Sequence, residues 1–261
     1  GAQIKFGQNK DATEKDDANN FFEKALLDFN KAAEINPNEP LAYLNLGHVK
    51  QNVGNLAQAI QHYTSAIKLK TDYADAYMNR GNIYLQIAKF TEAVDDYTNV
   101  LRLVPNEVHA YNNRGVAYKN LDKLEEAVSD YNKAIEIAPG GSASYGNLGW
   151  IYSIRGELDK ALTNLDKAIE IEPKNPNNFL NRGITYNKKG MELKAAQNKE
   201  GIQQGDANTF FDKALHDLNK VLEINPNEPK VHLNIGEVKF NKGEINDVVT
   251  SYQKASELYS N

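Results

Sequence analysis

The sequence has no cysteine, one tryptophan and two methionines among its 261 residues. Without cysteine it can form no disulfide, no thiolate nucleophile and no cysteine-ligated zinc or iron–sulfur site. A cysteine-free chain tolerates any redox environment, so this absence leaves the compartment open. Long apolar runs are also missing, because no segment approaches the roughly 20 apolar residues that a membrane-spanning helix needs. Hydrophobic residues make up 41% and charged residues 25%, which predicts a soluble, folded chain without membrane insertion.

Clusters of positive charge are scarce as well. The 30 Lys and Arg are outnumbered by 35 Asp and Glu, and the formal net charge is -5. We find no basic block that could neutralise a row of phosphates. The composition therefore predicts no nucleic-acid partner.

Residue patterns that indicate catalysis are missing too. The histidines are His48, His62, His109, His216 and His232. None forms a metal-ligand pair at helical spacing or lies beside a nucleophile in a recognisable context. The segment 140–142 follows Pro139 and lacks the Lys-Ser/Thr ending of a phosphate-binding loop, so we expect a turn there. We predict no catalytic residue, no metal site and no cofactor.

An internal repeat is the main feature that the sequence does contain. The motif aromatic-x-x-(Leu/Arg)-Gly recurs every 34 residues, with its glycines at Gly47, Gly81, Gly115, Gly149 and Gly183. A sixth copy ends at Gly236, 53 residues after the fifth, so 19 additional residues lie inside the fifth repeat. Alanines and prolines recur with the same period, at Ala59, Ala93, Ala127, Ala161 and Ala214 and at Pro105, Pro139, Pro173 and Pro226.

This spacing predicts pairs of antiparallel helices. Gly and Ala at fixed positions let two helices approach closely, while the aromatic residues fill the gaps between neighbouring pairs. One predicted second helix runs from Leu124 to Ile137, where apolar residues follow the i, i+3, i+4, i+7 pattern of a core-facing stripe. The proline after such a helix stops it and turns the chain.

The combined pattern, Tyr-x-x-Leu-Gly-x-x-Tyr followed by Ala-x-x-x-Tyr/Phe and Pro, resembles the tetratricopeptide repeat over essentially the whole chain. The resemblance implies an all-α fold, a right-handed superhelical solenoid of antiparallel helix-turn-helix repeats. It divides a single solenoid, residues 1–261, into a partial enlarged repeat at 1–39, regular repeats at 40–73, 74–107, 108–141 and 142–175, an enlarged repeat at 176–228 and a last repeat at 229–261.

A second duplication relates the two ends of the chain. The first 72 residues align with the last 72 at an offset of 189, so the N-terminus repeats the enlarged unit without most of its first helix. Asn20 to Glu23 and Thr209 to Asp212 have capping-box spacing, which predicts that a second helix starts near each pair. The polar stretch around Gly201 and Gly205 is the predicted loop of the enlarged repeat.

One position of the repeat is always asparagine, at Asn45, Asn79, Asn113, Asn147, Asn181 and Asn234. Asn is a poor helix former, so its recurrence inside a helix suggests that the amide is used. In tetratricopeptide solenoids this position faces the concave surface. The row resembles the asparagine ladder of the O-linked N-acetylglucosamine transferase and kinesin light chain solenoids, which implies that these amides hold the backbone of an extended polypeptide. The alternative is that each Asn bonds a neighbouring helix and fixes the stacking of repeats.

The same family register places further residues on the concave face. The predicted peptide-binding residues besides the asparagine row are Met78, Asn82, His109, Asn112 and Trp150, and the neighbouring concave positions are Leu44, His48, Val116, Leu180, Ile184, Leu233 and Phe240. Trp150 is predicted either as an anchor in the groove or as a core residue, and both alternatives stay open.

The register also excludes one kind of partner. The carboxylate clamp of chaperone-tail recognition needs Lys and Arg in the groove, and this chain has Leu44, Met78, Ala143 and Asn147 there. Arg80, Arg114 and Arg182 stand where the repeat usually has Leu, and we expect interhelical ion pairs or hydrogen bonds from them.

These observations predict a non-catalytic protein-protein interaction module that binds an extended peptide segment of a partner, of unknown identity, in its concave groove. The alternative is a scaffold that assembles head to tail as a homo-oligomer through its ends, because Val248, Val249, Tyr252 and Ala255 have no following helix to cover them. A third alternative is the substrate-recruiting region of a larger enzyme.

Overall fold

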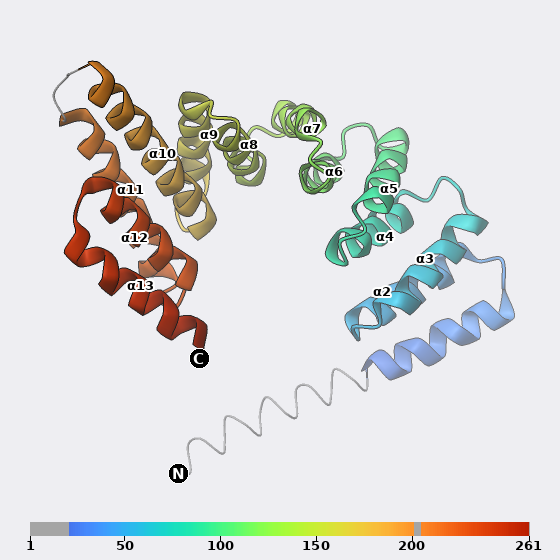
Figure 1. The fold of residues 1–261 in the computed structure, drawn as a ribbon. Helices are drawn as coiled ribbons and strands as arrows, with labels where there is room; N and C mark the ends of the chain where they lie inside the picture. Colours follow the sequence, from blue (N-terminus) through green and yellow to red (C-terminus); the bar gives the residue numbers. More distant parts are fainter. Residues whose placement is uncertain (1–20, 201–204, 261) are drawn as a thin grey trace, which may run out of the picture. The chain divides into compact units, whose positions relative to one another are not determined.

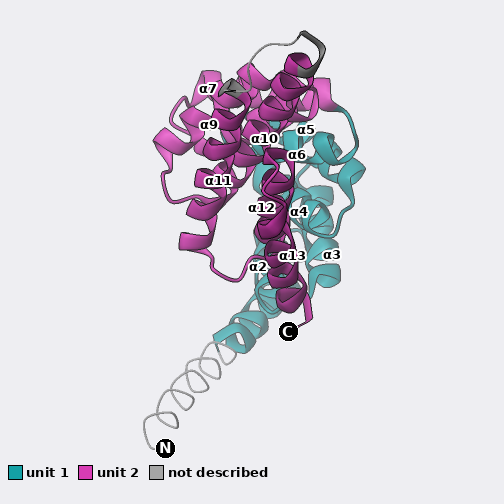
Figure 2. Ribbon diagram, turned by 60° about the vertical axis from the view of Figure 1, so that its left-hand side comes forward, with its two compact units in different colours: residues 1–123 teal, residues 124–261 magenta. Residues whose placement is uncertain are grey.

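The computed structural model describes residues 21–200 and 205–260, and within these ranges every regular element is an α-helix (Figure 1). The all-α helical repeat fold predicted from the sequence is confirmed. The chain divides into two compact units, residues 1–123 (unit 1) and residues 124–261 (unit 2), coloured separately in Figure 2.

The helices come in pairs along the chain. Unit 1 contains a helix at residues 21–35, followed by α2 (Pro40–Asn52), α3 (Leu56–Leu69), α4 (Ala74–Gln86), α5 (Phe90–Leu103) and α6 (Val108–Asn120). Unit 2 contains α7 (Leu124–Ile137), α8 (Ser142–Ile154), α9 (Leu158–Ile171), α10 (Pro176–Glu200), α11 (Gly205–Ile224), α12 (Pro229–Lys242) and α13 (Ile245–Ser260). We call α2, α4, α6, α8, α10 and α12 the first helices and α3, α5, α7, α9, α11 and α13 the second helices.

The signature glycines let the two helices of a pair touch. A Cβ placed on Gly47 of α2 would lie 2.4 Å from the ring of Tyr63 on α3, which is fully buried. A Cβ on Gly149 of α8 would lie 2.7 Å from Leu165 on α9. Only a residue without a side chain fits such a crossing, so the glycines at these two positions follow from the close packing of α2 with α3 and of α8 with α9.

Proline follows four of the six second helices, as predicted. The helices α5, α7, α9 and α11 all stop two residues before a proline of the periodic row. A proline cannot continue the helical hydrogen bonds, and it disfavours the helical conformation of the residue before it. The second helix predicted from Leu124 to Ile137 is α7, with the same bounds.

The turn inside a regular pair uses a residue with positive φ. Gly54 has φ 78° and Gly156 has φ 79° at equivalent places in their repeats. Ala88 and Asp122 occupy this place in the two repeats between them, each with φ 59°. The turn geometry is therefore kept even where the residue is not glycine.

The enlarged repeat is a longer helix pair. Its insertion lengthens α10 to 25 residues and α11 to 20 residues. The helix α11 begins at Gly205, so the predictions of a loop at Gly205 and of a start near Thr209 were wrong by about one helical turn. The reason is packing, because Gly190 of α10 meets the buried ring of Phe211 and the extended helices stay in contact. Gly201 and the capping box predicted at Asn20 lie outside the described residues.

The last helix is only partly uncovered. Val248 and Ala255 are buried, so the prediction that they lack cover was wrong. The helix α13 packs against α12. Val249 and Tyr252 are 57% and 42% exposed, as expected.

The first helices form the tighter layer of each unit. In unit 1, α4 contacts α6, and in unit 2, α10 contacts both α8 and α12. Comparable contacts between second helices are not found in the described ranges. Neighbouring first helices therefore approach one another directly, and their shared surface is where a ligand would meet several repeats at once.

Candidate functional site

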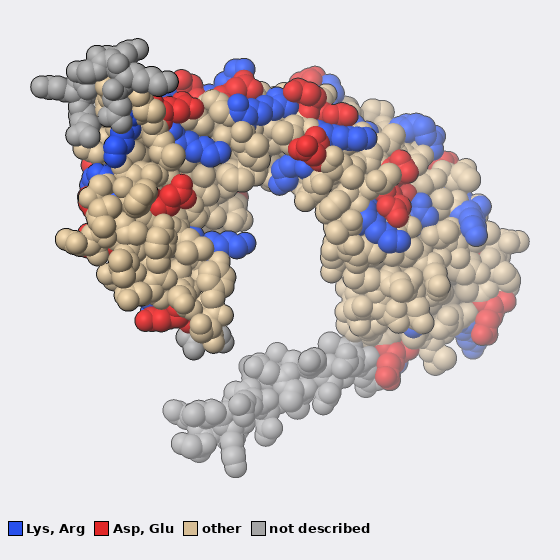
Figure 3. Space-filling view, viewed as in Figure 1, with Lys and Arg blue, Asp and Glu red and all other residues tan. Residues whose placement is uncertain are grey.

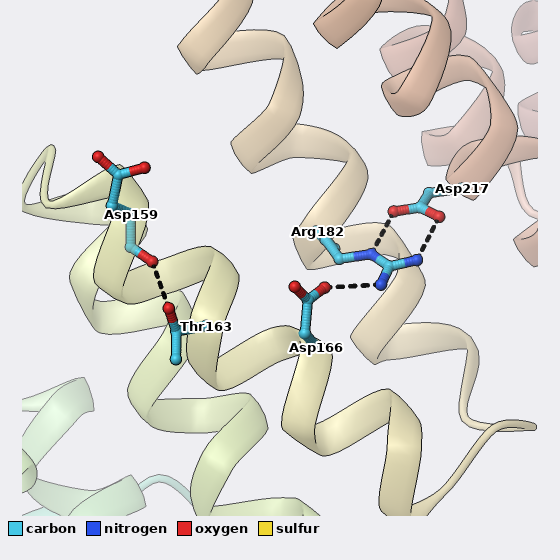
Figure 4. A network of polar contacts seen from close by, with 5 residues as sticks. All are labelled: Asp159, Thr163, Asp166, Arg182 and Asp217. Carbon is cyan, nitrogen blue, oxygen red and sulfur yellow. Dashed lines mark hydrogen bonds and ion pairs between the residues drawn. The ribbon is translucent and has the colours of Figure 1, made fainter.

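An arginine joins three helices of unit 2 (Figure 4). Arg182 of α10 donates from Nε and Nη2 to both carboxylate oxygens of Asp217 on α11, at 2.7 and 2.8 Å. Its Nη1 donates to Asp166 on α9 at 2.7 Å. Burial acts to lower the pKa of Arg182, but the hydrogen bonds and charges of the two carboxylates outweigh it and raise that pKa above its ordinary value.

Unit 1 contains the same arrangement. Arg80 of α4 donates to both carboxylate oxygens of Asp96 on α5, at 2.8 and 2.7 Å, and to Thr64 on α3 at 2.9 Å. Burial raises the pKa of the Asp96 carboxyl, and the hydrogen bond and charge of Arg80 offset part of that rise. Arg114 of α6 donates to Thr98 on α5 at 3.1 Å. The predicted interhelical role of the three arginines is confirmed, and they are not free to bind a ligand.

The acidic partners of Arg80 and Arg182 were not predicted, although the sequence contains a signal for them. Where the position before the signature Gly is Arg, an Asp follows 16 residues later, or 35 residues later across the insertion. Where that position is Leu46, Leu148 or Ile235, the residue 16 positions later is His62, Asn164 or Ser251. Arg and Asp thus occur together, repeat by repeat, within this one chain.

Asparagines of the row directly precede these arginines in the sequence, and their side chains project from a different side of the helix. Successive residues of a helix are about 100° apart around its axis, so Asn79 and Arg80 face different neighbours. All six asparagines are half-buried. The amides of Asn79 and Asn234 donate to carbonyls one turn earlier in their own helices, at 2.7 Å each. No side-chain hydrogen bond of Asn45, Asn147 or Asn181 is found in the described part of the chain.

Asn113 alone among the row bridges two repeats in the described residues. Its Nδ2 on α6 donates to Oδ1 of Asn82 on α4 at 3.0 Å. The same oxygen of Asn82 accepts from the hydroxyl of the buried Tyr97 on α5, at 2.8 Å. Two donors occupy the Asn82 oxygen, so Asn82 is fixed in place, and the carbonyl oxygen of Asn113 is left to accept from a ligand.

A cavity of about 410 Å³ lies beside this amide pair in unit 1. It is lined by Ala74, Asp75, Met78, Asn82, Val100, Val104, Glu107, His109 and Asn113. Four of the predicted peptide-binding residues therefore meet here, two from α4 and two from α6. The volume falls in the range of about 300–1,000 Å³ that is typical of ligand sites.

Other predicted residues lie elsewhere. Leu44 is 5% exposed and belongs to the core of unit 1, so its prediction as a concave surface residue was wrong. It packs against the buried residues of the helix pairs, as the apolar stripe of a helix does. Leu233 and Phe240 are 40% and 59% exposed, as a groove position requires.

Trp150 is neither fully exposed, as an anchor in the groove would be, nor fully buried, as a core residue would be. The side chain is half-buried on α8 in unit 2, and the ammonium of Lys188 on α10 lies 6.0 Å from the centre of the indole ring. That ammonium donates to the carbonyl of Ser153 at 2.9 Å. Trp150 occupies the same repeat position as Asn82, one residue after the signature Gly.

Charge on the surface is mixed in sign. In Figure 3, Lys and Arg side chains lie next to Asp and Glu side chains over α7 to α9, and they form no block of one sign there. The helices in the described ranges include none that is long and apolar enough to cross a membrane. Across those same ranges, no group of three or more His, Asp and Glu side chains is placed to hold a metal ion.

Sequence models of the tetratricopeptide repeat match the chain in three sets. One matches residues 74–107 and 108–140, a second matches 53–88 and 149–190, and a third matches 29–61 and 130–163. Together these matches run without a gap from residue 29 to residue 190, which is more than half of the chain. A search of curated proteins by sequence finds no match.

Solved structures resemble the chain over most of its length. YrrB, described as a TPR protein with an unusual peptide-binding site, is 25% identical, covers 78% of this chain and 95% of its own, and superposes with a TM-score of 0.58. MamA is 28% identical over 61% of this chain and 94% of its own, with a TM-score of 0.57. A tetratricopeptide repeat protein from Parabacteroides merdae shares the fold over 97% of this chain and 91% of its own, at 21% identity and a TM-score of 0.68.

Proposed function

The chain belongs to the tetratricopeptide-repeat family, and we propose that it is a protein-protein interaction module that holds an extended segment of a partner along its first helices. The observation that carries the proposal is the cavity of unit 1, where Met78 and Asn82 of α4 meet His109 and Asn113 of α6. Two neighbouring repeats contribute to it, as an extended ligand that spans repeats requires. The peptide-binding site named for YrrB supports this use of the fold.

The amide chemistry suits a peptide backbone. An Asn side chain offers one acceptor and two donors, which complement the N–H and C=O groups of a peptide unit. A net hydrogen bond contributes about 0.5–1.5 kcal/mol, and ordering a flexible segment opposes it. We therefore expect moderate affinity that depends on several repeats together.

The test replaces Asn113, Asn147 and Asn181 together by Ala. We expect retention of an immobilised random peptide library to fall at least about tenfold, because three hydrogen bonds are lost. The melting temperature of the variant should stay the same or rise, because Ala exceeds Asn in helix propensity by up to about 0.7 kcal/mol per residue. Peptide retention and thermal melting by circular dichroism measure the two effects.

The matched control is a triple Ala variant of Asn99, Asn219 and Asn246, which lie on the second helices α5, α11 and α13. It removes the same number of amides from the other layer and should bind like the parent protein. Unchanged binding by the first variant, with normal melting, would show that the asparagine row serves repeat stacking only.

Self-association is a second candidate function, favoured by large apolar side chains that the units leave exposed. Phe21, Leu27 and Ile35 on the helix at 21–35 are 72%, 70% and 76% exposed, and Val249 and Tyr259 on α13 are 57% and 58% exposed. Apolar surface of this kind can be buried against a second copy of the chain.

Light scattering across a dilution series tests self-association. We expect the mass to rise above 29.2 kDa with concentration, and Val249→Lys with Tyr259→Lys to abolish the rise, because burying a lysine in an apolar contact is unfavourable. A mass of 29.2 kDa at every concentration would rule this function out.

A further inference from the structure

We propose that the cavity of unit 1 accepts a Lys or Arg side chain of the bound segment. This inference rests on the proposed function, and it assigns the chemistry of one position of the ligand. It follows from three features of the cavity, which are an apolar wall, two carboxylates and the amide pair beside them.

The apolar wall suits the stem of a long side chain. Met78 is half-buried on α4, Val104 is 41% exposed at the end of α5, and both line the cavity. Lys and Arg bury their methylene stems along apolar surface and keep the charged end near water or a counterion. A cavity of about 410 Å³ has room for one such side chain.

The two carboxylates make the cavity negatively charged. Asp75 is exposed in the first turn of α4, and Glu107 is half-buried at the start of α6. One oxygen of Glu107 accepts from the backbone N–H of His109 at 3.1 Å, which fixes the side chain and leaves its second oxygen open. Among the described residues that line the cavity, none is Lys or Arg. A basic side chain would therefore find opposite charge without competition from the lining.

His48 does not compete with a ligand for Asp75. Burial lowers the pKa of His48, and the opposing effect of Asp75 is the smaller of the two. His48 is accordingly neutral at pH 7, and it supplies no counterion to Asp75.

The amide pair places the ligand backbone beside the cavity. The amide of Asn113 is fixed by Asn82, and its carbonyl oxygen can accept from a peptide N–H. A segment held there would direct one side chain between α4 and the start of α6, where Asp75 and Glu107 lie. The cavity would thus act as a specificity pocket for a single residue.

The experiment uses peptide libraries that differ only at a fixed central residue. The centre is Lys, Arg, norleucine or Glu, flanked on each side by mixed residues, and retention on the immobilised full chain is quantified. Norleucine has the stem of Lys without the ammonium, so it isolates the charge. We expect Lys and Arg to be retained about three- to fivefold more than norleucine, the size typical of a solvent-accessible ion pair, and Glu to be retained least.

The double variant Asp75→Asn with Glu107→Gln should remove this preference, so that the Lys, Arg and norleucine libraries are retained alike. Gln at 107 keeps an oxygen that can accept from the N–H of His109, so the start of α6 is preserved. Glu92→Gln is the matched control, because Glu92 is an exposed acid on α5 outside the cavity and should leave the preference intact. About 1 M salt should weaken the Lys preference, because the Debye length is then only about 3 Å and the attraction between the ligand ammonium and the two carboxylates is screened.

Three results would overturn the inference. Equal retention of norleucine and Lys by the parent protein, with binding still dependent on Asn113, would remove the basic specificity but leave peptide binding in place. A Lys preference that survives Asp75→Asn with Glu107→Gln would place its origin outside the cavity. Failure to retain any library, whatever its central residue, would overturn this inference and the proposed function together.

Discussion

Replacing Arg182 by Leu is expected to destabilise unit 2 by about 3–5 kcal/mol, the cost of leaving a buried charge without its partner. The Asp217 side chain is 2% exposed and receives two hydrogen bonds from Arg182. Without the guanidinium, its carboxylate would be buried and unpaired. Asp166 loses its partner as well, but it is 55% exposed and can be solvated. Urea unfolding followed by circular dichroism measures the loss.

The neighbouring repeat suggests how to restore this stability. In that repeat Leu148 and Asn164 stand at the positions of Arg182 and Asp217. We therefore expect Arg182→Leu combined with Asp217→Asn to recover most of the lost stability, because no buried charge remains. Equal stability of the single and double variants would contradict this account. It would mean that the cost arises from lost packing of the arginine and not from the unpaired Asp217.

Replacing Gly47 by Ala should destabilise unit 1 by about 1–2 kcal/mol. Overpacking of a core costs about 1–3 kcal/mol, and the gain in helix propensity offsets at most about 1 kcal/mol. The added Cβ would lie 2.4 Å from the ring of Tyr63, which is fully buried. The Tyr63 hydroxyl also donates to Gln51 at 2.7 Å, so the ring has little freedom to move away. Urea unfolding again measures the change.

Gly236→Ala is the matched control for Gly47→Ala. Its Cβ would also lie 2.4 Å from a ring, that of Tyr252. Tyr252 is 42% exposed on α13 and can turn toward solvent, so we expect no loss of stability or a small gain. A loss at Gly236 as large as that at Gly47 would show that the backbone crossing, and not the burial of the ring, sets the cost.

The arginines and the asparagine row have different roles within a repeat. Arg80 and Arg182 each form an ion pair with the second helix of their own repeat, and each also contacts the second helix of the preceding repeat, Arg80 by a hydrogen bond to Thr64 and Arg182 by an ion pair with Asp166. The adjacent asparagines stay half-buried on the first helices. A rigid stack of this kind would present amides to a ligand without first having to order them.

Local features of the fold were predictable because they depend on short-range rules. The prolines end α5, α7, α9 and α11, and the apolar stripe from Leu124 to Ile137 is α7. Both follow from the hydrogen-bonding capacity of proline and the period of a helix. The recurring Arg in the Leu position indicated an interhelical contact, although it did not identify the buried Asp that accepts it.

Features that depend on packing were missed. Gly190 stands where Gly54 and Gly156 make a turn, yet it is helical because the insertion continues α10 and brings Gly190 against Phe211. Leu44 was assigned to the groove from the family register, but it is buried in the core of unit 1. In both cases the local pattern was compatible with two environments.

By itself the sequence determined the repeat, the helical class and the pairing of helices, because a period of 34 residues with fixed Gly, Ala and Pro positions allows few other arrangements. Only the tertiary structure decided which of the predicted binding residues meet. Met78, Asn82, His109 and Asn113 share one cavity because α4 and α6 pack side by side, and that packing brings Asp75 and Glu107 to the same place. Distances between side chains of different repeats depend on how helices cross, and that crossing is set by the volumes of all the residues between them.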